Sequence, residues 1–287
     1  MSGLVAVIFI GLVVASAIIF AQHFYRSDSE IRKNKKRIYT WWIIFIICLP
    51  VCIFGGWLTY LFVCGLFSLA LFELIKLSSL GINYFFASLL IFILVSFYEF
   101  SESYLYLSAF LLFSSAWLAK FRSGFSFFLV ILYIGACLQS LLQIVEFSQL
   151  NSMNSGMILL SLLFISAIND IAQYIAGRKF GRRPLASKIS PNKTIEGAAG
   201  GLFVTGLVSV ILLPDTLNVR WPTALAIGLV LSLLGILGDL YFSKVKRSLG
   251  IKDTGNLLPG HGGVLDRMDS MLLVAPGFGL VLIYLIG

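Results

Sequence analysis

Four aspartates lie in or beside long apolar segments, where an ionised side chain is unusual. Asp170 and Asp239 fall inside apolar runs. Asp266 and Asp269 stand three residues apart, just before the last run. A charged group inside a membrane span costs roughly 2.5 to 3.5 kcal/mol on insertion scales, so such residues usually have a function. If these carboxylates converge near phosphates, their hard oxygen atoms suit Mg²⁺ better than zinc. The alternative is that each aspartate only pairs with a nearby lysine or arginine.

Basic residues and glycines surround these aspartates, above all in segments 190–197 and 259–263. Glycines allow backbone N–H groups to surround an anion, and basic side chains supply the opposite charge. The basic residues are Lys193, Lys246, Arg247, Lys252 and Arg267. No Walker sequence occurs, so a P-loop is not indicated. For each glycine segment, an ordinary turn stays the alternative.

Helical spacing adds polar neighbours to Asp239. Ser243 follows it by four residues, and Lys246 or Arg247 by seven or eight, so these side chains share one helix face. His261, between glycines, either contacts a phosphate or closes a turn. Thr194 or Ser190 is placed to cap the helix that follows, whose N-terminus is itself an anion site.

The composition excludes an ordinary water-soluble globule. Only 12% of the 287 residues are charged, where a soluble domain carries about 25%. Hydrophobic residues make up 59%, and they form uncharged runs long enough to cross a bilayer core of about 30 Å. Four cysteines lie inside these runs with no histidine beside them, which indicates neither a disulfide framework nor a zinc site. We expect an all-α, polytopic membrane protein.

About ten membrane-spanning helices are expected to position the site. The run 41–72 holds 32 residues without a charge, about 48 Å of helix, which is too long for one crossing. Pro50 and Gly55-Gly56 therefore predict a hairpin within 41–76. The other expected spans are 3–22, 80–98, 104–118, 125–145, 157–177, 197–213, 222–242 and 271–286. We expect about six helices in 1–150 and a catalytic region in 151–287, whose loops are 178–196 and 243–270.

The basic residues predict the orientation, because lysine and arginine gather in cytoplasmic loops. Of the 21, only Arg220 falls on the opposite side if the run 41–72 crosses twice. The candidate site is then on the cytoplasmic rim, and both termini face away from the cytoplasm. The six basic residues of 26–37 are typical of a topology anchor that also touches anionic lipid.

Residues 238–269 resemble the signature of the phosphatidate cytidylyltransferases, also called CDP-diacylglycerol synthases. About 15 positions match over 32 residues: Gly238, Asp239, Ser243, Lys246, Arg247, Lys252, Asp253, Pro259, Gly260, His261, Gly262, Gly263, Asp266, Arg267 and Asp269. Segments 169–181 and 190–197 are similar to a second block of that family. Ile195 and Gln173 depart from the usual pattern, which bears on fine substrate preference more than on activity.

The resemblance implies that CTP and phosphatidic acid react with Mg²⁺ to give CDP-diacylglycerol and pyrophosphate. It leaves open a second metal ion and a homodimer, and implies no nucleic-acid partner. Asp239 and Asp266, then Asp269 and Asp170, are the implied metal ligands. The remaining implied site residues are Lys246, Arg247, Lys252 and Arg267 for the triphosphate, Lys193 for the lipid headgroup, Ser190, Ser243, Gly260, His261, Gly262 and Gly263 for phosphate contacts, and Asp253 among the catalytic residues.

The charges of the two substrates define the chemical problem. A lipid phosphate whose second pKa is near 6 is largely dianionic at neutral pH, so it can attack the α-phosphorus of CTP without a general base. Each pair of like unit charges about 4 Å apart costs roughly 4 kcal/mol at an effective dielectric constant of 20. A metal and a basic cluster are the expected remedy.

Two other functions remain as alternatives. A transporter also uses intramembrane carboxylates, but it places them near the midplane and often in repeated halves. Here the polar residues crowd one rim. The nearer alternative is a lipid kinase that uses CTP, or an enzyme that acts on another lipid phosphate. Product analysis distinguishes these functions, because a kinase releases CDP rather than pyrophosphate.

Overall fold

The structure is a computed structural model, and it describes residues 28–77, 124–151, 153–187, 189–248, 250–255, 257 and 262–285. The expected spans 3–22, 80–98 and 104–118 lie outside these ranges. The count of ten spans and the division of the chain at residue 150 therefore stay predictions.

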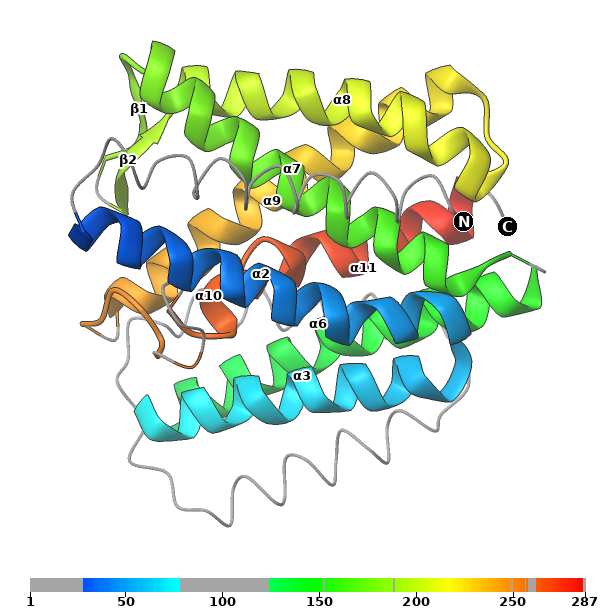
Figure 1. Cartoon of the computed structure of the whole chain (residues 1–287), viewed down its shortest axis with the longest axis horizontal. Helices are drawn as coiled ribbons and strands as arrows, with labels where there is room; N and C mark the ends of the chain where they lie inside the picture. The colour runs from blue at the N-terminus through cyan, green and yellow to red at the C-terminus, as the bar shows by residue number, and fades with distance from the viewer. Residues whose placement is uncertain are drawn as a thin grey trace.

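Helices make up almost all of the described structure, as Figure 1 shows. In chain order the elements are α2 (Asp28–Phe54), α3 (Gly56–Leu77), α6 (Gly124–Leu150), α7 (Ser155–Phe180), β1 (Pro184–Ala186), β2 (Ser190–Thr194), α8 (Ile195–Leu217), α9 (Trp221–Ser248), α10 (Leu265–Met268) and α11 (Met271–Leu285). Within the described ranges, four helices are long and apolar enough to cross a membrane: α3, α7, α8 and α9. The predicted all-α membrane protein is confirmed at this level.

The long apolar run turns between α2 and α3, at the place where the sequence predicts a hairpin. The backbone turns at Gly55 and Gly56, whose φ angles of +58° and +52° are ones that glycine adopts without strain. Pro50 does not break the helix, since it lies inside α2. The two helices of the hairpin lie side by side in Figure 1.

The basic segment 26–37, expected as a topology anchor outside the apolar run, is helical from Asp28 onward. Its lysines, arginines and glutamate are good helix formers, so a continuous helix can extend past the apolar run. For the same reason α9 continues through Lys246 and Arg247 to Ser248. Hydropathy located the apolar part of each helix but not its polar extension.

A small antiparallel sheet, which the sequence did not predict, lies between α7 and α8. Pro184 pairs with Thr194, and Ala186 with Ser190. The Glu196 carboxylate accepts hydrogen bonds from the backbone N–H groups of Arg182 and Arg183, at 3.0 and 3.2 Å. Thr194 is the N-cap of α8 and accepts from the Gly197 N–H at 3.1 Å, which confirms the cap expected there.

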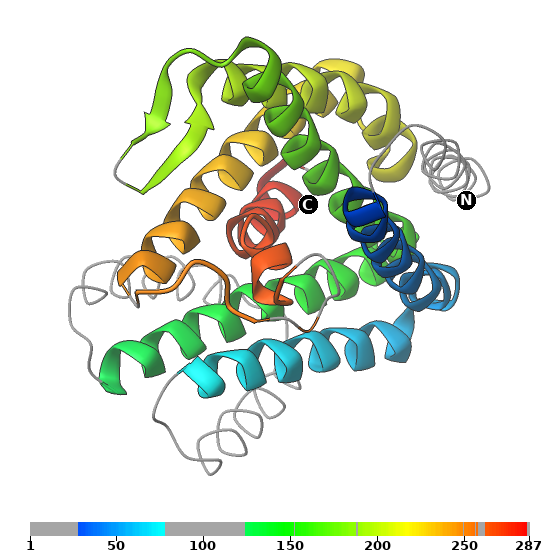
Figure 2. The ribbon, with the colours of Figure 1, turned by 60° about the vertical axis from the view of Figure 1, so that its left-hand side comes forward.

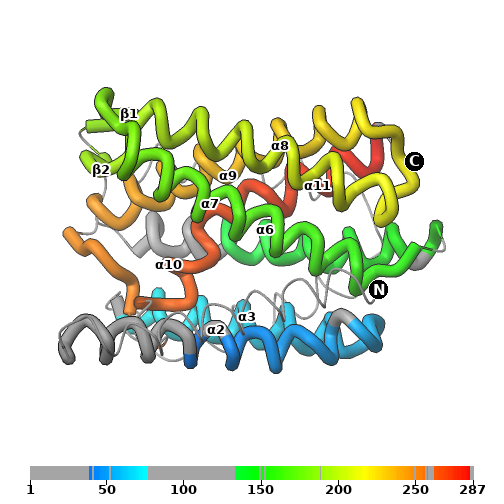
Figure 3. The backbone as a smooth tube through the Cα atoms, turned by 45° about the horizontal axis from the view of Figure 1, so that its top comes forward, coloured from blue at the N-terminus to red at the C-terminus, as the bar shows by residue number. Residues whose placement is uncertain are grey.

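The core places α11 among the other helices, as Figure 2 shows. It contacts α6, α7 and α9. The Tyr133 hydroxyl of α6 donates to the Leu272 carbonyl of α11 at 3.2 Å, and the Tyr133 ring meets Tyr241 of α9 edge to face. Small residues allow α8 to approach α7 and α9, as Gly228 does against Ser209. The sheet and the loop between α9 and α10 lie toward the same end of the bundle in Figures 1 and 3.

Candidate active site at one end of the bundle

Three aspartates from separate parts of the chain gather near this end. They are Asp170 of α7, Asp239 of α9 and Asp269 in the turn between α10 and α11. Ser270 links two of them, because its hydroxyl donates to Asp170 at 3.1 Å and its backbone N–H donates to Asp269 at 2.9 Å. Burial, followed by the negative charge of Asp239, raises the pKa of Asp269 well above its usual value, although Lys246 opposes the shift. These carboxylates are therefore close enough to repel one another.

Two lysines supply positive charge to the carboxylates. The Lys193 ammonium, from β2, forms an ion pair with Oδ2 of Asp239. Lys246, from α9, lies 2.9 Å from Oδ1 of Asp266 and 3.7 Å from Oδ2 of Asp269. The simple pairing weighed for each aspartate is thus present at Asp239, Asp266 and Asp269, although it joins β2, α9, α10 and the turn after α10 rather than near neighbours.

Asp266 holds the loop between α9 and α10 in place. Its Oδ2 accepts hydrogen bonds from the Thr254 N–H at 2.8 Å, the Thr254 hydroxyl at 3.1 Å and the Gly263 N–H at 3.0 Å. Burial raises the pKa of Asp266, but the hydrogen bonds from Lys246 and from the Gly263 and Thr254 backbone outweigh it and hold the pKa below its usual value. The carboxylate is therefore a stable anion, with Oδ1 facing Lys246.

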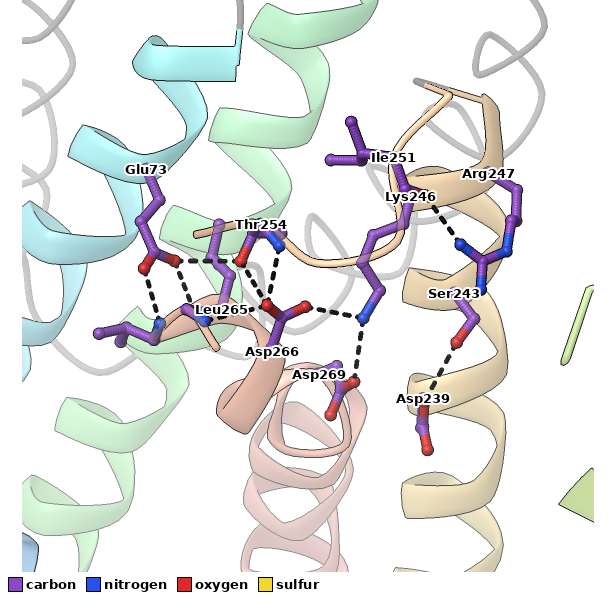
Figure 4. A network of polar contacts seen from close by, with 12 residues as sticks. Glu73, Asp239, Ser243, Lys246, Arg247, Ile251, Thr254, Leu265, Asp266 and Asp269 are labelled. Atoms are coloured by element: carbon purple, nitrogen blue, oxygen red, sulfur yellow. Dashed lines mark hydrogen bonds and ion pairs between the residues drawn. The ribbon is translucent and has the colours of Figure 1, made fainter. Parts of the chain in front are cut away.

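Glu73 of α3 is a site residue that the sequence reasoning missed. Its side chain is only 2% exposed, and it accepts hydrogen bonds from the Val264 N–H at 2.8 Å, the Leu265 N–H at 3.0 Å and the Thr254 hydroxyl at 3.2 Å. Figure 4 shows these contacts beside Asp266. The available signal was a carboxylate directly beside an apolar run, the same signal that singled out Asp266 and Asp269.

Two glycines are required by close approach at this end. A Cβ on Gly263 would lie 2.6 and 2.7 Å from the two Glu73 carboxylate oxygens, and one on Gly238 would lie 2.9 Å from the Asp269 carbonyl oxygen. A side chain at either position would push the loop or α9 away from the carboxylates. The glycines of the signature thus serve packing here as well as any contact with an anion.

Asn169 fixes the helix that carries Asp170. It is 1% exposed, and its Oδ1 accepts from the Ser232 hydroxyl at 2.6 Å and the Thr205 hydroxyl at 3.2 Å. These bonds tie α7 to α9 and α8. The hydrogen bonds of Asn169 therefore fix the orientation of α7 about its axis, and with it the position of the neighbouring Asp170.

The other predicted site residues lie around this centre with different degrees of exposure. The Ser243 hydroxyl donates to Asp239 at 3.3 Å, and the exposed Arg247 donates to the Ile251 carbonyl at 2.8 Å. Lys252, Asp253 and Arg267 are exposed, and Ser190, Gly262 and Gly263 lie on the sheet and the loop before α10. Gly260 and His261 lie outside the described residues.

The donor chemistry of the cluster suits a hard divalent cation such as Mg²⁺. Among the residues that the structure describes, no three carboxylate, histidine or cysteine side chains are grouped closely enough to hold a metal as they stand. Lysine ammonium groups face Asp239, Asp266 and Asp269 instead. A cation bound to these carboxylates would neutralise their negative charge in place of the lysines.

Comparison with known proteins points to one family. A model described as "Cytidylyltransferase family" matches residues 35–285. Uncharacterized protein YnbB of Escherichia coli strain K12 is 34% identical over 253 residues, which is 84% of this chain and 85% of that protein. Phosphatidate cytidylyltransferases of Bacillus subtilis strain 168 and Staphylococcus aureus strain COL are 39% and 45% identical, over 52% and 40% of this chain. The matches span about half of these two enzymes, 54% and 45% of their lengths.

Proposed function

Because the chain belongs to the cytidylyltransferase family, we propose that it transfers the CMP group of CTP to phosphatidic acid, giving CDP-diacylglycerol and pyrophosphate. The protein is accordingly a membrane-embedded nucleotidyltransferase of phospholipid synthesis. The observation that carries the proposal is the family match over residues 35–285. The site geometry supports it, since carboxylates and lysines meet at one end of the bundle.

The reaction needs the two anions to be brought together. An oxygen atom of the lipid phosphate attacks the α-phosphorus of CTP, and the bond to the β-phosphate oxygen breaks as pyrophosphate leaves. Lys246, Arg247, Lys252 and Arg267 hold the triphosphate and neutralise the pyrophosphate. Lys193 holds the lipid phosphate from the sheet. Ser190, Ser243 and the glycine-bearing loop contribute phosphate contacts, and the acyl chains stay in the bilayer.

Asp170, Asp239 and Asp269 would hold the Mg²⁺ ion, together with Oδ1 of Asp266, which now accepts from Lys246. Mg²⁺ bound there would neutralise phosphate charge and polarise the α-phosphoryl group. The proposal covers one bound ion or two. Lys193 and Lys246 reduce the repulsion among these carboxylates.

We place the site on the cytoplasmic side, in the inner membrane of a bacterium. The orientation follows from the distribution of lysine and arginine, and CTP is supplied on that side. The sheet and the loop before α10, which carry the proposed phosphate contacts, lie toward one end of the bundle in Figure 3.

Product analysis with two labelled forms of CTP tests this function. Purified protein in mixed micelles with phosphatidic acid and Mg²⁺ should transfer label from [α-³²P]CTP into lipid, release pyrophosphate, and transfer none from [γ-³²P]CTP. Label entering lipid from the γ-position, with release of CDP, would replace the proposal with a lipid kinase. No lipid labelling from either form would contradict both.

A further inference from the structure

We propose that Glu73 is a positioning residue for the reaction, because its carboxylate fixes both the loop that carries Thr254 and the start of α10, which carries Asp266, and so places Lys246 at the aspartate cluster. This inference rests on the proposed function only for its effect on activity. Glu73 comes from α3, which is far in sequence from the residues that Glu73 holds, and none of its hydrogen-bond donors is a proposed substrate contact.

Burial makes the contacts of Glu73 informative. A carboxylate removed from water loses several kcal/mol of solvation unless it is paired or hydrogen-bonded. The ion pairs among the described residues do not include Glu73. Its compensation there comes from hydrogen bonds, with Oε1 accepting from Val264 and Oε2 from Leu265 and Thr254. Each donor belongs to the loop or to the start of α10, so the loop position is tied to the carboxylate.

Thr254 joins Glu73 to Asp266. Its hydroxyl lies 3.2 Å from Oε2 of Glu73 and 3.1 Å from Oδ2 of Asp266, and it can donate its one proton to only one of them at a time. Its backbone N–H donates to Asp266 at 2.8 Å. Thr254 thus uses its side chain and its backbone to fix the carboxylates of Glu73 and Asp266 relative to each other.

The network continues from Asp266 to the aspartate cluster. Asp266 accepts from Lys246 at 2.9 Å, and Lys246 also faces Asp269 at 3.7 Å, as drawn in Figure 4. Displacing the loop would therefore move the ammonium group that we assign to the triphosphate. Misplacement of a reacting group by about 1 Å can cost on the order of 100-fold in rate.

Glu73→Gln tests the proposal, because it keeps the size of the side chain but turns one acceptor oxygen into an N–H donor facing loop donors. Glu146→Gln is the matched control. Glu146 lies on α6 and accepts one hydrogen bond, from the Tyr60 hydroxyl of α3 at 2.6 Å, which a glutamine can still accept. Thr254→Val and Thr254→Ser form a second pair, in which only serine keeps the bridging hydroxyl.

Two measurements are made on the folded fraction of each protein in detergent. We expect kcat to fall about 10- to 100-fold in Glu73→Gln and Thr254→Val, with the KM for CTP changed much less, and Thr254→Ser and Glu146→Gln to retain most activity. Hydrogen exchange of the peptide covering residues 262–268 should be faster in Glu73→Gln and Thr254→Val only.

The outcomes separate this proposal from the proposed function. If the wild-type protein makes no CDP-diacylglycerol, the proposed function is refuted. Hydrogen exchange of residues 262–268 then decides by itself whether Glu73 positions the loop. An active wild type with Glu73→Gln at more than half its kcat, or with equal losses in Glu146→Gln, overturns the role of Glu73. If Glu73→Gln fails to fold, the Thr254 pair decides by the same criteria.

Discussion

Two groups of carboxylates lie on either side of Lys246, and they differ in how their charge is satisfied. Glu73 and Oδ2 of Asp266 accept hydrogen bonds from backbone N–H groups and from Thr254, so these oxygen atoms are satisfied without an added ion. Asp239 and Asp269 rely mainly on lysines, and the pKa of Asp269 is raised by burial and by neighbouring negative charge. The first group shapes the loop, whereas the second group gains from a cation.

The largest effect should come from removing the charge of Asp239, one of the two carboxylates that rely mainly on lysines. We expect Asp239→Asn to lower kcat/KM at least 1,000-fold while folded protein still accumulates in the membrane, because the amide barely changes volume but weakens a cation site. The assay is transfer of [α-³²P]CMP to lipid, with detergent solubility as the folding control. Activity within 10-fold of wild type would remove Asp239 from the mechanism.

Removing the lysine between the two groups should affect both stability and activity. Lys246→Met leaves two buried carboxylates without their cation, and breaking such a pair costs about 3 kcal/mol or more. We expect a lower thermal unfolding temperature and loss of turnover. Lys246→Arg keeps the charge and should recover most of the stability, so equal destabilisation by both substitutions would show that shape rather than charge matters at this position.

The difference between the two groups also shows what the sequence could predict. Asp170 and Asp239 were identifiable because ionisable residues in apolar runs are costly, Asp269 because it stands just before such a run, and the glycine turn at Gly55 from run length. Glu73 stands just after the run assigned to a hairpin. Its hydrogen-bond partners lie 181 to 192 positions further along the chain, and no local pattern predicts a contact over that separation. Likewise the sheet of β1 and β2 lies beside a Glu196 carboxylate that accepts from two backbone N–H groups, a contact that a short polar segment does not predict.

A moderate effect is expected at the residue that orients Asp170. Asn169→Ala removes the acceptor for Ser232 and Thr205 and leaves their buried hydroxyls without it, which costs about 1 to 3 kcal/mol. We expect a lower unfolding temperature and a several-fold fall in kcat for the folded fraction. Unchanged stability would mean that the contacts among α7, α8 and α9 do not depend on this side chain.

The smallest effect should lie in the basic segment at the start of α2. Arg37→Ala removes one of six basic residues of 26–37 and none of the charges assigned to the site, so we expect activity within about twofold of wild type. Parallel assays of Arg247→Ala provide the comparison. A loss at Arg37 as large as that at Arg247 would extend the functional site to α2.

The central claim is that Asp239 and Asp269 bind a divalent cation. Binding of Mn²⁺ in place of Mg²⁺ tests it most directly. Free Mn²⁺ is measured by electron paramagnetic resonance during titration of purified wild type, Asp239→Asn and Glu146→Gln. We predict saturable binding to wild type and Glu146→Gln, and binding weakened at least 10-fold in Asp239→Asn. Equal binding to all three proteins, or no saturable binding to wild type, would contradict the account.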